Sequence, residues 1–221
     1  MIMRLPQLDE RLQKAANLFP ACGYGADIGA DHGRLSCYLL AKNLCERMCV
    51  SDLSAPSLKK AERLLHMHGF SNRADFCIGD GITVLPQKAN AIAILGMGGK
   101  TIAHIIKDGR EKLLGATLVL SAHTELHILR KAIVDIGYCI EEEDIAYAGG
   151  RFYVIIRAVP GKCTYNEKEI LIGPKLLVGK SEHYIPYLEW RKGVLSCENN
   201  NIGRSHYQMI EEEWQRANHR P

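Results

Sequence analysis

Strand-like and helix-like segments alternate along this chain from residue 24 to residue 137. Short apolar or β-branched runs favour strands, and apolar residues that recur every three or four positions favour helices. An earlier helix ends at Pro20. The expected strands are 24–28, 47–52, 74–80, 91–96 and 116–122, and the expected helices are 34–43, a segment opened by Ser54 and Pro56, 100–113 and 125–137. Such alternation predicts a mostly parallel sheet covered by helices on both faces.

The alternation stops after residue 137. Residues 138–159 contain two strand-like runs joined by Ala148-Gly149-Gly150, with no helix between them. This pattern is typical of a hairpin, so we expect an antiparallel strand near the end of the sheet.

The last quarter of the chain has a different pattern. Pro160-Gly161 marks a boundary, which predicts one domain over residues 1–160 and an extension over 161–221. We expect residues 162–174 to be irregular and 197–205 to be a polar linker between two helices, giving a small helical, coiled-coil-like hairpin. The apolar positions of these helices are Ile185, Leu188 and Leu195 in the first and Tyr207, Ile210, Trp214 and Ala217 in the second.

Composition and charge restrict the class of protein. No apolar run reaches membrane-spanning length, and the first residues do not form a signal peptide, so we expect a cytoplasmic protein without a membrane partner. The eight cysteines include no C-x-x-C pair, which favours free thiols and no metal site. The formal net charge of +3 is compatible with a polyanionic partner but does not require one.

The loop after the first expected strand of the alternating region has the composition of a nucleotide site. Gly29 allows close approach of a ligand to the backbone, and Gly33 allows the next helix to pack tightly. The dinucleotide pattern G-x-G-x-x-G requires a glycine at the position of Asp31. A carboxylate there disfavours the pyrophosphate of NAD and favours a ligand with sulfonium and ammonium groups, such as S-adenosylmethionine.

Three further loops follow the next three strands. Asp52 ends the second strand, where an acidic side chain can bind ribose hydroxyls. Gly79-Asp80-Gly81 follows the third strand and offers a carboxylate to an adenine amino group, and residues 95–99 add an apolar, glycine-rich segment after the fourth. Each signal alone is weak, but four after consecutive strands predict a cofactor site.

Several segments resemble the bacterial tRNA (adenine-22-N1)-methyltransferases. They are ADIGADHGRL, SDLSAPSLKKAERLL, GDGITVL, AILGMGGKTI and YVIIRA. The resemblance implies a Rossmann-like class I S-adenosylmethionine-dependent methyltransferase fold, with a seven-stranded sheet and a helical C-terminal extension. Where this family usually reads Q-P-N after the fifth strand, the chain has Ser121-Ala122-His123.

The resemblance also implies residue roles. Cofactor contacts are expected from Asp27, Ile28, Gly29, Gly33, Asp52, Leu53, Asp80 and Gly81. The residues expected to face the target base are Asp31, His32, Gly96, Met97, Gly98 and Gly99.

The chemistry of adenine N1 limits what these residues must do. N1 carries an in-plane lone pair, so it can attack a methyl group without losing a proton, and positioning matters more than a strong base. Asp31 can tolerate the developing positive charge or accept the amino group, and it can also serve as a helix N-cap. His32 can contact the base or point to solvent. A paired adenine must be extruded first, for which Gly98-Gly99 would leave room.

The expected partner is tRNA, bound by a monomer or weak dimer. Candidate phosphate contacts are Arg4, Arg34, Lys59, Lys60, Arg63, Lys100, Lys107, Arg110 and Lys112. Two alternatives stay open: a methyltransferase with a non-RNA acceptor, and a cofactor-binding RNA-interaction module without turnover, suggested by Ser121-Ala122-His123. An NAD dehydrogenase ranks last because of Asp31.

Overall fold

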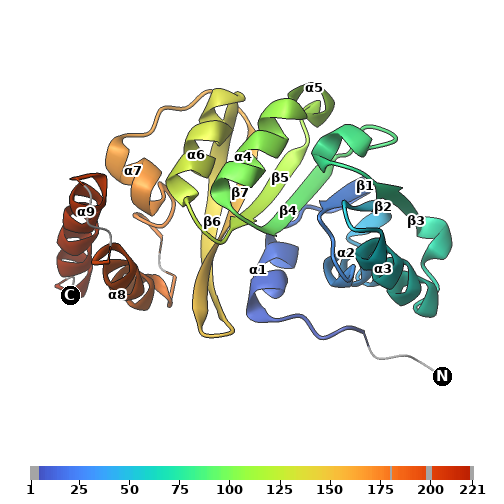
Figure 1. Ribbon diagram of the computed structural model, residues 1–221, viewed down its shortest axis with the longest axis horizontal. Coiled ribbons are helices and arrows are strands. Elements are labelled where there is room, and N and C mark those ends of the chain that lie inside the picture. The colour runs from blue at the N-terminus through green and yellow to red at the C-terminus, as the bar shows by residue number, and fades with distance from the viewer. Residues whose placement is uncertain (1–4, 180, 198–200, 220–221) are drawn as a thin grey trace.

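Seven strands form a single sheet in the order β3-β2-β1-β4-β5-β7-β6. The computed structural model describes residues 5–179, 181–197 and 201–219, and Figure 1 shows the arrangement of its elements. The strands are β1 Cys22–Ile28, β2 Cys45–Asp52, β3 Ala74–Ile78, β4 Ala91–Met97, β5 Thr117–Ala122, β6 Tyr138–Ala148 and β7 Arg151–Pro160. The helices are α1 Glu10–Leu18, α2 Arg34–Ala41, α3 Ala55–Met67, α4 Gly99–Asp108, α5 Arg110–Leu113, α6 Leu126–Asp135, α7 Glu167–Ile172, α8 Tyr184–Leu195 and α9 Asn201–Asn218.

The predicted sheet topology is confirmed. Strands β1 to β5 pair in parallel, whereas β7 runs antiparallel to both β5 and β6. Gly149 and Gly150 connect β6 to β7 with φ values of +57° and +78°. Left-handed conformations at both positions suit the tight turn of a hairpin.

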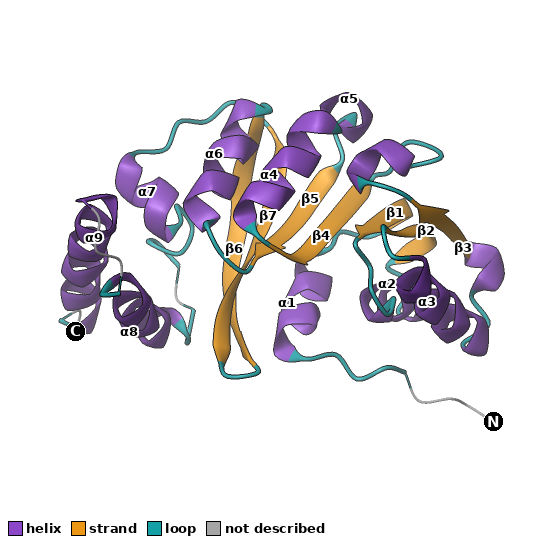
Figure 2. Ribbon diagram, in the orientation of Figure 1, coloured by secondary structure: helices purple, strands orange, loops and turns teal. Residues whose placement is uncertain are grey.

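Alternate residues of the central strands face two separate hydrophobic clusters. In β4, Ile92 and Ile94 pack with α4 and α6, whereas Ala91, Ala93 and Leu95 pack with α1, α2 and α3. The helices therefore cover both faces of the sheet, as the alternating sequence predicts (Figure 2).

Local sequence explains where several helices begin and end. Ser54 Oγ accepts a hydrogen bond from the Ser57 backbone N–H, which confirms the predicted start of α3. The segment expected as one helix over 100–113 is divided at Gly109 into α4 and α5. A Cβ at Gly109 would lie 2.6 Å from Cβ of Ile82, so close packing accounts for the glycine there.

The C-terminal segment contains more helix than expected. Residues 167–172 form α7, so the expected irregular stretch is wrong there; Asn166 and Glu169 make a capping box that starts it. Helix α9 begins at Asn201, inside the expected linker, whose residues 198–200 lie outside the described part of the chain. Leu188, Leu195 and Ile210 are buried as expected, whereas Ile185 is 38% exposed.

A buried ion pair joins this C-terminal segment to the sheet. Arg130 of α6 and Glu143 of β6 are both completely buried, and Nε of Arg130 donates to Oε1 of Glu143 over 2.8 Å. The same guanidinium donates to the last carbonyl oxygens of α7, those of Ile170, Leu171 and Ile172. Arg130 therefore caps the C-terminus of α7, where a positive charge is favoured.

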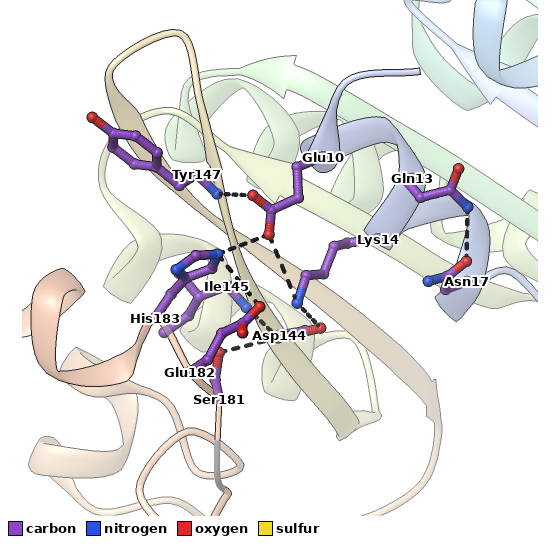
Figure 3. A network of polar contacts seen from close by, with 10 residues as sticks. All are labelled: Glu10, Gln13, Lys14, Asn17, Asp144, Ile145, Tyr147, Ser181, Glu182 and His183. Atoms are coloured by element: carbon purple, nitrogen blue, oxygen red, sulfur yellow. Dashed lines mark hydrogen bonds and ion pairs between the residues drawn. The ribbon is translucent and has the colours of Figure 1, made fainter. Parts of the chain in front are cut away.

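A second polar network fixes the first helix (Figure 3). Glu10 accepts hydrogen bonds from the Tyr147 backbone N–H at 3.1 Å and interacts with Nε2 of His183 at 2.9 Å. Lys14 forms a 2.7 Å ion pair with Asp144. Helix α1 is thereby tied to the β6–β7 hairpin and to the residue before α8.

We expect Arg130→Met to lower the free energy of unfolding by about 3–5 kcal/mol, because Glu143 then stays buried without its counter-charge. Urea denaturation measures this change. Lys107→Met breaks the exposed Lys107–Asp135 bridge and is the matched control, with an expected loss of at most about 1 kcal/mol. Equal losses of unfolding free energy in the two variants would show that the buried pair stabilises the fold no more than an exposed one.

Candidate active site

The order in which the strands are added to the sheet reverses between the parallel strands β1 and β4, and this places a crevice at their carboxyl ends. From this point β1, β2 and β3 follow one another to one side of the sheet, and β4 and β5 to the other. Open α/β sheets bind ligands at such a point. A cavity of about 490 Å³ lies there, and its lining includes five of the predicted site residues: Asp27, Gly29, Asp31, His32 and Gly96.

Asp27 places a carboxylate at the floor of this cavity. Its side chain is buried, and Oδ2 accepts a 2.7 Å hydrogen bond from Ser36 Oγ at the start of α2. Burial raises the pKa of Asp27 to about 6, and the nearby Asp52 charge adds to this shift. A buried carboxylate with a hydroxyl partner is suited to a positively charged group of a ligand.

The loop after β1 turns sharply under the cavity. Gly29 has a φ of +70°, a conformation that disfavours residues with a side chain, and a Cβ there would lie 2.2 Å from Cε of Met97, so the Met97 side chain would have to move. The backbone N–H groups of Gly29 and Ala30 both donate to the Ser51 carbonyl oxygen at 2.9 Å. These bonds hold the loop against the end of β2.

Asp31 lies at the mouth of the cavity in a left-handed conformation with a φ of +47°. Its backbone N–H donates to Oδ2 of Asp52, and its own Oδ2 lies 2.5 Å from Nδ1 of His32. The N-cap of α2 is Gly33, so the interpretation of Asp31 as the helix cap is wrong. The Asp31 side chain is 65% exposed and thus available to a ligand.

The other predicted cofactor residues are not gathered in this cavity. Both carboxylate oxygens of Asp52 accept backbone N–H groups, and Leu53 is 69% exposed. Asp80 and Gly81 line a smaller cavity of about 60 Å³ against α4. Ile28 is buried in the core, which leaves only its backbone for a ligand.

Gly33 has a packing role in the structure. Its φ is +67°, and a Cβ there would lie 2.7 Å from Cβ of Ala61. The expected tight packing therefore occurs against α3 as well as at the start of α2.

The glycines after β4 serve different purposes. Gly96, with a φ of +78°, lies at a β-bulge between Leu95 and Met97, and such bulges can re-aim side chains beside a site. Gly98 is the N-cap of α4. A Cβ at Gly99 would lie 2.3 Å from the Glu125 carbonyl oxygen, so the expected room is not present at Gly99, whereas a Cβ at Gly98 would make only ordinary contacts.

Arg11 and His123 of the cavity lining, and Tyr153 beside them, were missed as site residues. The Arg11 guanidinium lies 5.3 Å from the Tyr153 ring centre. The rings of His123 and Tyr153 meet edge to face at 5.4 Å. Burial and the neighbouring Arg11 charge lower the pKa of His123. These residues come from α1, the β5–α6 loop and β7, and no local sequence pattern links them.

The candidate phosphate contacts have varied surroundings. Arg34 lines the crevice, but Lys100 pairs with Glu125, Lys107 pairs with Asp135, and Lys112 donates to backbone carbonyl oxygens near Thr83. Arg4 lies outside the described residues. No helix in the described ranges is long and apolar enough to cross a membrane.

Comparison with known proteins identifies the family. The model of the family described as "Methyltransferase domain" matches residues 8–156. The chain belongs to this methyltransferase family. It is 28% identical over 213 residues to the tRNA (adenine(22)-N(1))-methyltransferase of Bacillus subtilis, covering 96% of this chain and 87% of that protein. It is also 27% identical over 180 residues to a putative tRNA methyltransferase of Mycoplasma pneumoniae, covering 77% and 81% of the two chains.

Solved structures of similar proteins share the methyltransferase fold. A protein in the NADB-Rossmann superfamily from Streptococcus agalactiae has a TM-score of 0.87 at 26% identity, covering 95% of this chain and 98% of that chain. A putative tRNA (m1A22) methyltransferase of Streptococcus pneumoniae, in complex with S-adenosyl-L-methionine, has a TM-score of 0.88 at 22% identity, covering 94% and 100%.

The raised pKa of Asp27 predicts a pH-dependent stability. The pKa of Asp27 is about 6 in the folded protein, whereas its ordinary value is 3.8. The folded state therefore binds this proton more tightly than the unfolded state does, and the resulting stabilisation is complete below about pH 4. This contribution is lost as pH rises through 6. We therefore expect Asp27→Asn to gain stability relative to wild type by up to about 3 kcal/mol between pH 4 and pH 7.

Urea denaturation across this pH range measures the difference. Glu62→Gln, which replaces an exposed carboxylate on α3, is the control. A difference between Asp27→Asn and wild type that does not change with pH would contradict the assigned burial of the charge.

Proposed function

We propose that this methyltransferase transfers a methyl group from S-adenosylmethionine to N1 of adenine 22 in tRNA. The observation that carries the proposal is the buried Asp27 carboxylate under the Gly29 loop, at the switch point of a methyltransferase fold. The acceptor comes from the named relative in Bacillus subtilis, which aligns with 96% of the chain.

The residues at the crevice fit this cofactor. Asp27 would hold a positively charged part of it, and the absence of a side chain at Gly29 allows it to lie against the backbone. When bound, S-adenosylmethionine supplies the electrophilic methyl group. The carboxylate of Asp31 at the cavity mouth would disfavour the pyrophosphate of NAD, which argues against a dehydrogenase.

The acceptor side of the cavity suits a base that becomes positively charged. Adenine N1 needs no general base, so the residues around it need only orient the ring and tolerate the charge. The lowered pKa of His123 favours a neutral imidazole there near pH 7. Asp31 would stabilise the cationic product or accept the amino group, and His32 holds the Asp31 carboxylate at 2.5 Å.

The proposal includes how the protein works in the cell. We propose that it acts in the cytoplasm on tRNA as a monomer or weak dimer, without a metal ion. Residues 1–160 would form the methyltransferase domain and 161–221 an extension that contacts the RNA.

Asp31→Ala is expected to lower kcat/KM for methylation of a tRNA transcript by about 100-fold, because it removes an exposed carboxylate from the cavity lining. Transfer of labelled methyl groups from S-adenosylmethionine measures the rate. Glu62→Gln on the exposed side of α3 is a control that should leave the rate unchanged. Unchanged rates for Asp31→Ala would remove this carboxylate from the mechanism.

The acceptor is tested with altered transcripts. A transcript with guanine in place of adenine 22 should accept no methyl groups, and equal methylation of this transcript would contradict the assigned base. Methylation of small molecules or proteins but not tRNA would favour the alternative acceptor class, and tight tRNA binding without transfer would favour a module without turnover.

A further inference from the structure

A second cavity adjoins the first one on the side of the C-terminal helices. Its volume is about 590 Å³, within the range of ligand sites, and His123 lines both cavities. Its walls come from the start of α6, the start of β7, and helices α8 and α9. Any group bound there lies next to whatever occupies the methyl-transfer site.

Aromatic rings form one wall of this cavity. The rings of Phe152 and Trp190 lie 6.0 Å apart at an angle of 56°, and both side chains are only partly buried. Tyr153, which borders His123, also lines the cavity. Partly exposed rings of this kind offer stacking surfaces, to which any nucleic-acid base can bind through its face.

Positive charge surrounds the rings. Arg151 is exposed at the start of β7, and Arg191 follows Trp190 in α8. Nε of Arg191 is buried and has no hydrogen-bond partner among the described residues. Among the described residues that line the cavity, Glu125 alone is acidic, and its carboxylate forms an ion pair with Lys100 at 2.6 Å.

Two histidines also line the cavity. The rings of His127 and His206 meet edge to face with ring centres 5.2 Å apart. Burial and then the charges of His206 and Arg191 lower the pKa of His127. Burial, the largest cause, disfavours charge of either sign, but the contribution of Arg191 reflects a positive charge beside the cavity, and such a charge attracts an anion such as a phosphate.

We infer that this second cavity binds the nucleotide adjacent to the target adenine, with its base against Phe152 and Trp190 and its phosphate at Arg151 and Arg191. The inference rests on the proposed function, because it takes the RNA strand as the acceptor. Stacking rings combined with guanidinium groups that have no ion-pair partner among the described residues match single-stranded nucleic acid. The shared His123 places the two subsites in sequence along one strand.

The stacking contact is tested by combining protein and RNA changes. Trp190→Ala should raise KM for tRNA about tenfold, the effect of losing one base–aromatic stack, without changing KM for S-adenosylmethionine. An abasic site at one of the two nucleotides flanking adenine 22 should cost wild type about the same factor. With that abasic tRNA, Trp190→Ala should have nearly the same KM as wild type. Trp190→Phe should recover most of the affinity for intact tRNA.

The phosphate contact has its own test, which does not depend on the packing of Trp190. Arg151→Gln and Arg191→Gln should each lower the slope of log affinity for tRNA against log salt concentration by about one. Lys88→Gln, which also removes one positive charge, is the control, because Lys88 is exposed in the loop before β4, at the end of that strand opposite to the crevice. Its slope should equal that of wild type.

The outcomes separate this inference from the proposed function. Suppose that wild type methylates adenine 22. If the losses from Trp190→Ala and from the abasic sites are then additive, and the arginine variants have the same salt dependence as Lys88→Gln, the second cavity does not bind the adjacent nucleotide. If wild type methylates no tRNA, the proposed function itself fails.

Discussion

The buried ion pair between Arg130 and Glu143 connects helix α7 of the C-terminal segment to the sheet. Two opposite charges without solvent contact are stable only when each has its partner and its hydrogen bonds. Arg130 satisfies this requirement by also binding the carbonyl oxygens at the end of α7. The C-terminal helices consequently share one hydrophobic cluster with the sheet, and the wall that they supply beside His123 has a fixed position.

A second constraint acts at the carboxyl ends of β1 and β4. The crevice between these strands brings the Asp27 carboxylate, the Gly29 turn and Asp31 to one cavity. The polar network of Glu10 and His183 fixes α1, and Arg11 follows Glu10 directly over the same cavity. Methyl transfer to a base needs positioning more than acid–base chemistry, and this arrangement supplies positioning from both sides.

Sequence patterns predicted the parts of the structure that depend on local periodicity. The five parallel strands, the Gly149-Gly150 hairpin and the loop residues Asp27, Gly29, Asp31 and Gly96 follow from segments that can be examined one at a time. Helix α7 was missed although Asn166 and Glu169 carry a capping-box signal, because the helix is only six residues long.

The remaining site residues depend on contacts between distant segments. Arg11 meets Tyr153 from a helix far away in sequence, and Trp190 meets Phe152 only because α8 docks on the hairpin. Gly99 was taken as free space, whereas tertiary packing fills the volume beside it. Contacts between distant segments and the packing around a glycine cannot be predicted from a single stretch of sequence.

The most direct measurement of the central claim is mass spectrometry of tRNA after incubation with the protein and isotope-labelled S-adenosylmethionine. Nuclease fragments would locate the label, and nucleoside analysis would identify the methylated atom. The account predicts one labelled methyl group, on N1 of adenine 22. Label at another nucleotide or another atom, or unlabelled tRNA with active cofactor present, would contradict it.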